Sequence, residues 1–320
     1  MTSTGTAVRP SWEQLPARLR DGLADRLGRV EGVQVQTGGF TPGLAARLQL
    51  ADGDRVFVKG IDAGHPLAGR YTDEARVTRA LPAAVPAPKL RWDARIAGWL
   101  VLAFDDAGGR HADLAPGSPD VAAVVETVAG LAAALTPCPV PDVPDAGIEL
   151  ADFVHGWREL AAGPDLPADA WVRRNLDLLA DAETAWLQAA DGATLLHGDI
   201  NRSNLLITEA GEAGGVVLVD WGQPVRGAAW IDVADLIPHL ILAGHTPAAA
   251  EDAVAGALAA ALREAGAGPE MVTGYAAGFA GYWARTSRLL DPPGVPHLRG
   301  HQARAARAAA AWVAHRTGWA

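Results

Sequence analysis

The sequence predicts an α+β fold of two lobes: a small N-terminal lobe with an antiparallel β-sheet and a helix, and a larger, mainly helical C-terminal lobe. Three observations support this. The length of 320 residues suits about two domains of ~150 residues. Short extended runs with turn signals fill the first hundred residues, and helical periodicity dominates the rest. We place the boundary in the flexible Asp-Asp-Ala-Gly-Gly joint, giving lobes at 1–105 and 106–320.

Three elements are expected in the N-terminal lobe. Extended runs at Leu44–Leu50 and Arg55–Lys59 flank an Asp-Gly pair, which is a hairpin signal. Tyr71–Leu81 is rich in helix formers and stops before Pro82, which cannot continue a helix. Gly98–Phe104 is predicted to be a short buried strand.

The C-terminal lobe is expected to be mostly helical. Ser118 and Pro119 are a cap and a first-turn residue for a helix over 121–135. Residues 137–144 form a proline-rich surface loop, and 168–190 carry apolar residues at helical spacing.

Further along, two short apolar runs at 205–207 and 216–219 predict a small hairpin. Residues 228–316 are expected to be helical, with breaks at Gly244, 266–269 and 291–296.

Composition excludes several classes of protein. The formal charge of −10 disfavours nonspecific binding to nucleic acid or anionic membranes. A single cysteine, Cys138, excludes an intramolecular disulfide framework and a thiolate zinc cage. The sequence has no run of roughly 20 apolar residues and no basic start followed by an apolar stretch. We therefore expect a cytoplasmic protein with no nucleic-acid or membrane partner.

The segment 195–222 contains the most informative motif. Asp199 is followed five residues later by Asn204, and Asp220 begins an Asp-Trp-Gly turn. Phosphoryl transfer needs a carboxylate to take the proton of the attacking hydroxyl, and oxygen ligands to hold Mg²⁺ against the phosphates. Asp199 suits the first role, and Asn204 and Asp220 suit the second.

These residues resemble the aminoglycoside phosphotransferase family of small-molecule kinases, over about residues 35–300. His197-Gly198-Asp199 stands where protein kinases have His-Arg-Asp, and Asp-Trp-Gly replaces Asp-Phe-Gly. The resemblance implies a protein-kinase-like fold. It also implies transfer of the γ-phosphoryl of ATP, or GTP, with Mg²⁺ to a hydroxyl of a small molecule. Gly198 cannot pair with a phosphorylated activation loop, which disfavours a protein kinase.

A nucleotide also needs a charge clamp. Lys59 ends the apolar run Val-Phe-Val-Lys, and Glu74 follows 15 residues later in the expected helix. This spacing suits the lysine–glutamate ion pair of kinases. Only Lys59 and Lys89 are lysines among 27 basic residues, so Lys59 stands out. The alternatives are a solvent-facing Lys59, and Asp73 in place of Glu74.

Two backbone features complete the predicted nucleotide site. The turn 37–43, with Gly38 and Gly39, would bring N–H groups to phosphate oxygens, or would be only a hairpin turn. The resemblance further implies a hinge at 104–107, including Phe104 and Asp106, whose backbone would meet the base.

Two residues are assigned to support of the catalytic loop. Asp232 would accept backbone N–H bonds from the loop, as the resemblance implies. Asp235 is the alternative, and a plain acid at a helix N-terminus is the simpler interpretation. His197 is expected to be a packed, hydrogen-bonded histidine.

The acceptor is the least determined part. Residues 141–190 hold ten carboxylates against three arginines, which is either a wall for a cationic acceptor or a set of solvated helix faces. Trp157, Trp283 and Trp312 are either core residues or an aromatic platform.

Antibiotic inactivation or self-resistance is the leading expectation for physiology. Metabolic kinases acting on choline-like, homoserine-like or sugar acceptors share the motifs, and a catalytically silent nucleotide-binding module is the rival from another class. The sequence predicts no oligomeric state.

Overall fold

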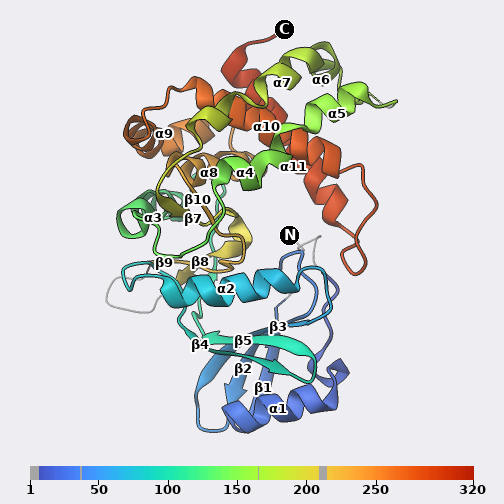
Figure 1. Cartoon of the computed structure of the whole chain (residues 1–320), viewed down its shortest axis with the longest axis vertical. Helices are drawn as coiled ribbons and strands as arrows, with labels where there is room; N and C mark the ends of the chain where they lie inside the picture. Colours follow the sequence, from blue (N-terminus) through green and yellow to red (C-terminus); the bar gives the residue numbers. More distant parts are fainter. Residues whose placement is uncertain (1–6, 37, 165, 209–214) are drawn as a thin grey trace. The chain divides into compact units, whose positions relative to one another are not determined.

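The computed structural model describes residues 7–36, 38–164, 166–208 and 215–320, without the side chains of 152 and 153. The chain forms two compact units (Figure 1). The N-terminal unit comprises residues 1–111, 203–223 and 291–298, and the helical unit comprises the rest. Two segments from later in the chain thus belong to the N-terminal unit, and the division at residue 105 stays a prediction.

A five-stranded antiparallel sheet forms the N-terminal unit, in the order β1-β2-β3-β5-β4. Its strands are β1 (Val30–Val35), β2 (Leu44–Leu50), β3 (Arg55–Asp62), β4 (Leu90–Ile96) and β5 (Trp99–Asp105). The β2–β3 hairpin and β5 lie where the sequence predicts them. Gly53 in the hairpin has φ +91°, a conformation that favours glycine.

Helices cover the two faces of this sheet (Figure 1). On one face, the leucines of α1 (Ala17–Leu27) pack with alternate residues of β2 and β3, such as Leu48 and Val58. On the other face, α2 (Ala68–Ala80) packs its Tyr71 and Ala75 against Leu102. Helix α2 confirms the predicted helix, whereas α1 and β4 were not predicted.

A second, three-stranded sheet in the same unit joins β6 (Arg110–His111), β8 (Leu205–Thr208) and β9 (Gly215–Leu218). Strands β8 and β9 pair from Leu205 opposite Leu218, as the predicted hairpin requires. This hairpin holds Asn204 and Asp220 at its base.

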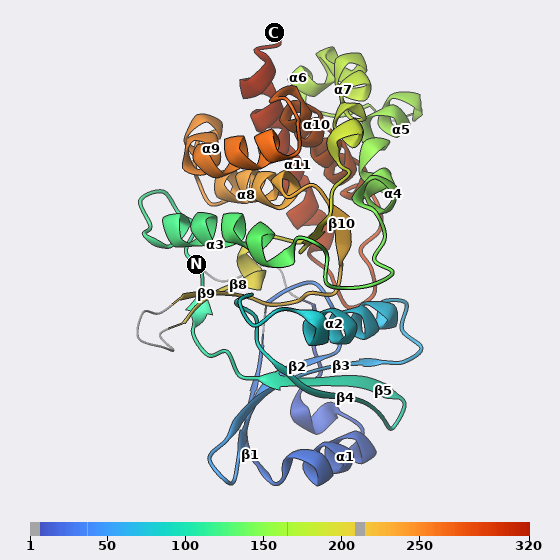
Figure 2. The same cartoon turned by 60° about the vertical axis from the view of Figure 1, so that its left-hand side comes forward.

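Helices dominate the other unit (Figure 2). Four of them confirm the predicted long helices and their breaks: α8 (Trp230–Leu242), α9 (Pro247–Glu264), α10 (Glu270–Thr286) and α11 (Leu298–Thr317). Shorter elements are α4 (Ala146–Glu149), α5 (Gly156–Ala162) and the paired strands β7 (Thr194–Leu196) and β10 (Val225–Gly227). Glycines allow α5 and α10 to cross closely, since a Cβ on Gly156 would lie 2.1 Å from the backbone of Gly281.

Two predictions for this unit need correction. Helix α3 (Asp120–Leu135) places Pro119, and not Ser118, at the N-cap, while the Ser118 hydroxyl accepts from the Asp120 N–H at 3.3 Å. The stretch 168–190 is not one helix. Asn175 interrupts it between α6 (Ala170–Arg174) and α7 (Leu176–Ala182), and donates its side-chain N–H to the carbonyl of Trp171.

No helix among the described residues is both long and apolar enough to cross a membrane.

Candidate active site

Lys59 lies at the centre of a charged cluster in the N-terminal unit. It stands on the central strand β3, on the face that α2 covers, and its side chain is 12% exposed. Its Nζ donates to Glu74 Oε2 on α2 at 2.6 Å and to Asp220 Oδ1 at 2.8 Å. The structure thus brings together three of the predicted site residues from positions far apart in the sequence.

Electrostatics keep this lysine charged. Burial disfavours the ammonium, but the carboxylates of Asp220 and Glu74 outweigh it and raise the pKa of Lys59. The competing acid, Asp73, pairs with Arg76 at 3.2 Å on the outer side of α2. Glu74 is therefore the acid that meets Lys59, because α2 turns it inward to 3% exposure.

Asp220 and Asn204 lie at one end of the β8–β9 hairpin. The Val219 N–H donates to the Asn204 carbonyl at 3.0 Å, which continues the ladder by one pair. Asp220 follows with φ +69°, a left-handed conformation that costs a non-glycine residue energy and clusters at functional sites. Its side chain is 41% exposed, whereas Asn204 is buried.

The donor chemistry of this hairpin end fits Mg²⁺. One carboxylate and one carboxamide are hard oxygen ligands, and an ion bound to a nucleotide completes its shell with phosphate oxygens and water. The partial exposure of Asp220 leaves that carboxylate accessible to such an ion.

The loop carrying Asp199 belongs to the helical unit and is held by carboxylates of α8. Asp232 accepts the N–H groups of His197 at 2.8 Å and Gly198 at 3.1 Å. Asp235 accepts the N–H of Ile200 at 3.0 Å. The two acids that the sequence offers as alternatives therefore both hold the loop.

Burial explains the electrostatics of these two acids. It raises the pKa of Asp232 to about 6, although both backbone donors oppose the shift. Burial and the nearby carboxylates of Asp199 and Asp232 raise the pKa of Asp235 well above its usual range. The phenol of Tyr275 donates to Asp235 at 3.1 Å. These contacts make α8 and α10 a rigid support for the loop.

Asn201 is a neighbour of Asp199 that sequence reasoning missed. Its side-chain N–H donates to Asp199 Oδ1 at 2.8 Å, which fixes the carboxylate. Gly198 has φ +71°, so the turn before Asp199 favours glycine where protein kinases have arginine. His197 is fully buried, as expected for a packed histidine.

The predicted glycine turn is described from Gly38 onward, and Thr37 lies outside the described residues. Gly39 has φ +81°. The carbonyls of Gly38 and Gly39 accept from Arg9 Nη2 at 2.8 Å and from the Ala7 N–H at 3.0 Å. Sequence reasoning missed this contact with the N-terminal segment, because it joins residues about thirty positions apart.

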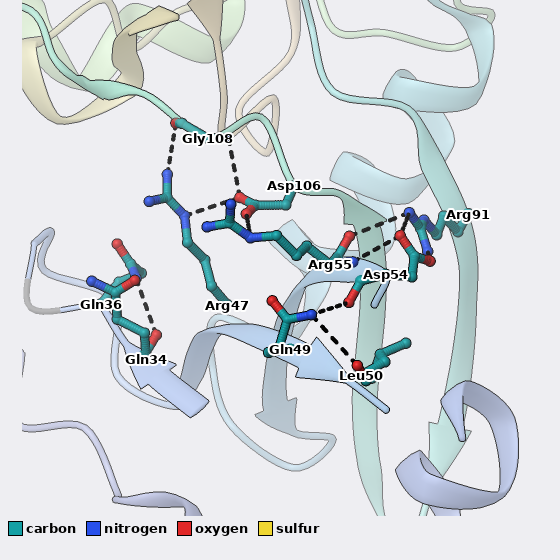
Figure 3. Close-up of polar contacts among 10 residues, drawn as sticks. All are labelled: Gln34, Gln36, Arg47, Gln49, Leu50, Asp54, Arg55, Arg91, Asp106 and Gly108. Atoms are coloured by element: carbon teal, nitrogen blue, oxygen red, sulfur yellow. Dashed lines mark hydrogen bonds and ion pairs between the residues drawn. The ribbon is translucent and has the colours of Figure 1, made fainter. Parts of the chain in front are cut away.

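The predicted hinge follows β5. Phe104 is buried between the sheet and α2. The Asp106 side chain, 5% exposed, pairs with Arg47 at 2.9 Å and Arg55 at 3.4 Å (Figure 3). Arg47 also donates to the carbonyl of Gly108 at 2.7 Å. Side chains of β2 and β3 thus anchor this segment, and the carboxylate of Asp106 serves that anchoring.

Four of the acidic residues of 141–190 serve separate local roles. Asp145 pairs with Arg226, Glu159 with Arg285, and Asp169 caps α6. Glu183 is fully buried and accepts the N–H of Trp157 at 2.9 Å. This distribution favours the simpler interpretation over an acidic wall. Asp165 lies outside the described residues, and the Asp152 side chain is likewise not described.

The three tryptophans also differ. Trp157 and Trp312 are core residues with at most 1% exposure. Trp283 is partly exposed and makes tilted or edge-on ring contacts with Phe279, His239 and His301, with a centroid distance of 4.3 Å to Phe279.

Together, the lysine–carboxylate cluster, the Asn-Asp hairpin and the anchored Asp199 loop are typical of kinase-like phosphotransferases. The model of the phosphotransferase enzyme family matches residues 43–277. This match covers more than half of the chain, and the chain therefore belongs to that family, as the resemblance predicted.

Solved structures share the fold at low sequence identity. Amicoumacin kinase hAmiN, in complex with AMP-PNP, Ca²⁺ and Ami, is 12% identical, with 95% of this chain and 94% of that chain covered and a TM-score of 0.57. The GDP and kanamycin complex of APH(2")-IIia is 13% identical, with coverage of 91% and 98% and a TM-score of 0.59.

A choline/ethanolamine kinase family protein from Mesorhizobium loti is 14% identical, with coverage of 92% and 94% and a TM-score of 0.56. These likenesses confirm the predicted bilobal, kinase-like α+β fold. No curated protein sequence matches the chain.

Proposed function

We propose that this protein transfers the γ-phosphoryl group of ATP to a hydroxyl of a small molecule, with Mg²⁺ as the metal. The observation that carries the proposal is the position of Lys59 between Glu74 and Asp220. Family membership supports a phosphotransferase, and the donor set at the β8–β9 hairpin supports a divalent cation.

Asp199 is the proposed general base. The acceptor oxygen forms a bond to the γ-phosphorus, the bond between that phosphorus and the β–γ bridging oxygen breaks, and ADP leaves. The proton of the acceptor hydroxyl passes to the Asp199 carboxylate, which Asn201 orients. Asp232 and Asp235 keep the loop in place while this charge moves.

Lys59 is proposed to neutralise charge on the α- and β-phosphates, with Glu74 fixing its position. Asn204 and Asp220 would hold the Mg²⁺ ion, which supplies charge neutralisation on the transferring phosphoryl group. The backbone at Gly38 and Gly39 and at 104–107 would contact the nucleotide. ATP is the proposed donor, and GTP is an outcome of the test.

We propose that the acceptor is an antibiotic, so that phosphorylation inactivates it or protects a producing cell from its own product. The reaction would take place in the cytoplasm. Two of the similar structures, by their names, contain amicoumacin and kanamycin. The likeness to a choline/ethanolamine kinase family protein supports a metabolic kinase as the second candidate. The scattered roles of the acidic residues in 141–190 weaken the argument for a polycationic acceptor in particular.

A coupled assay for ADP or GDP release, run on an antibiotic and metabolite panel, tests the proposal. Mass spectrometry should detect the gain of one phosphoryl group on the acceptor. The Asp199→Asn variant should form no product, and omission of Mg²⁺ should abolish transfer. Nucleotide binding without transfer to any acceptor would favour a catalytically silent module instead.

A further inference from the structure

The N-terminal segment lies against the glycine turn of the nucleotide site. The Ala7 N–H donates to the Gly39 carbonyl at 3.0 Å, and Arg9 Nη2 donates to the Gly38 carbonyl at 2.8 Å. Between them, the Val8 N–H donates to the carbonyl of Gly294 at 2.7 Å. All of these residues belong to the N-terminal unit, so Arg9 has a fixed position beside the turn.

Arg9 is a largely buried cation near Asp220. Burial lowers the pKa of its guanidinium, while the nearby Tyr71 and Asp220 raise it. Its Nε atom is buried and, within the part of the chain that the structure describes, finds no hydrogen-bond acceptor. A buried donor without a partner loses its hydrogen bond to water and gains none in return, so such a group calls for an explanation.

Tyr71 presents a second buried donor in the same place. It stands on α2 one turn before Glu74, is 2% exposed, and its ring lies 5.4 Å from Lys59 Nζ. Its hydroxyl is buried and has no acceptor among the described residues. Burial raises the pKa of this phenol to about 12, so the hydroxyl keeps its proton and can donate.

The Nε–H of Arg9 can only donate and the phenol of Tyr71 can donate, so an acceptor would satisfy both groups. Tyr71 adjoins Lys59, a third donor, and Arg9 adjoins the glycine turn, which suits a phosphate chain. We propose that Arg9 and Tyr71 bind phosphate oxygens of the nucleotide, so that the N-terminal segment forms part of the phosphate site. For the nucleotide, this inference rests on the proposed function.

Two conservative variants test the proposal. Arg9→Gln keeps a donor for the Gly38 carbonyl but removes the charge, and Tyr71→Phe keeps the ring over Lys59 but removes the hydroxyl. Calorimetry would compare ATP, ADP and adenosine for each variant. We expect Arg9→Gln to weaken ATP and ADP binding about tenfold or more and Tyr71→Phe about three- to tenfold, with adenosine unchanged. Arg18→Gln, at an exposed position of α1, and Tyr282→Phe are the matched controls.

Wild-type affinity for ATP in both variants would overturn the proposal, and so would an equal loss for adenosine. If either variant unfolds early in a thermal melt, Arg9→Lys gives the test, since it keeps the charge but loses the planar fork. Arg9→Lys should bind ATP more weakly than the wild type and more tightly than Arg9→Gln. Wild-type ATP affinity in Arg9→Lys would overturn the proposal.

Inorganic tripolyphosphate separates this inference from the proposed function. Binding of tripolyphosphate that depends on Arg9, without transfer to any acceptor, would support the phosphate site and reject the kinase activity. Normal transfer by Arg9→Gln and Tyr71→Phe with unchanged ATP affinity would support the kinase activity and reject the role of Arg9 and Tyr71 in the phosphate site.

Discussion

The two units neutralise their buried charges in different ways. In the N-terminal unit, Lys59 meets Glu74 and Asp220, side chains that come from separate elements. In the helical unit, Asp232 meets two backbone N–H groups, and Asp235 meets one N–H group and a phenol.

This difference separates exchangeable from fixed contacts. A side chain such as Asp220 can change partner when phosphates and a metal bind, because its rotamer can change while the backbone stays. A backbone N–H can leave its carboxylate only if the loop changes conformation. The first arrangement suits ligand binding, and the second suits a scaffold. The predictions below test this comparison.

Asp199→Asn should have the largest effect. The variant keeps the shape of the side chain but cannot take the acceptor proton, so kcat should fall by at least about 10³-fold. ATP affinity should change little, because Asp199 is not proposed to contact the nucleotide. Steady-state kinetics and calorimetry check this, with Asp181→Asn at an exposed site of α7 as the control. Transfer at the wild-type rate would refute the assignment of the base.

Lys59→Ala should come next, with about a 10²-fold loss of kcat/KM and weaker ATP binding, because phosphate charge is no longer neutralised. The only other lysine, Lys89, is exposed, and Lys89→Ala is the control. Unchanged ATP affinity and rate in Lys59→Ala would show that this cluster is only structural.

Local signals in the sequence predicted much of the fold. The Asp-Gly pair marks the β2–β3 turn, and α2 ends at Ala80, shortly before Pro82. The missed elements lack such signals. Helix α1 buries only Leu19 and Leu23, and β4 alternates exposed charges such as Arg91 and Asp93 at the sheet edge. A narrow apolar stripe and a polar edge strand both resemble loops in a single sequence.

The site divides in the same way. The residues of the Asp199 and Asp220 motifs are close in sequence, so their chemistry could be predicted from spacing. Arg9 and Tyr71 adjoin the cluster only through the fold, and no periodicity links Arg9 to Gly38. The sequence offers Asp232 and Asp235 as alternatives for one role. Only the geometry of α8 shows that both acids hold the loop.

Asp232→Asn tests the fixed side of the comparison. The two carboxylate oxygens of Asp232 each accept one backbone N–H, from His197 and from Gly198. An amide has only one acceptor oxygen, so its NH₂ group would face one of these N–H groups, which would lose its hydrogen bond. We expect a loss of about 2–3 kcal/mol in the free energy of unfolding. Chemical denaturation measures it, with Asp220→Asn as the comparison, for which we expect a smaller change because Asp220 is 41% exposed and Lys59 keeps its contact with Glu74. An equal or larger loss in Asp220→Asn would break the distinction between the two units.

His239 on α8 gives a pH test within the helical unit. Burial, with a smaller effect of His301, lowers the pKa of His239 to about 3. In the unfolded chain the histidine has a pKa near 6.5, so below that pH the unfolded state binds a proton that the folded state does not bind. The free energy of unfolding therefore decreases as the pH falls below about 6.5. Between pH 7 and pH 5 the loss should reach up to about 2 kcal/mol. His239→Phe keeps the ring contacts with Phe279 and Trp283, and should be less sensitive to acid than the wild type. Parallel stability curves for the two proteins would contradict this.

The smallest effects concern two arginines near the hinge, because one pairs with a buried carboxylate and the other with an exposed one. Arg47 pairs with Asp106, whose side chain is 5% exposed, whereas Arg91 pairs with Asp105, whose side chain is 49% exposed. Arg47→Ala leaves a buried carboxylate with only the more distant Arg55, and should cost about 1–2 kcal/mol. Arg91→Ala should cost less than about 1 kcal/mol, and that cost should shrink in high salt because water and ions screen the pair. Denaturation of both variants at low and high salt measures the difference. Equal costs would mean that the carboxylate of Asp106 is as well solvated as that of Asp105, and that the anchoring of the hinge does not depend on Arg47.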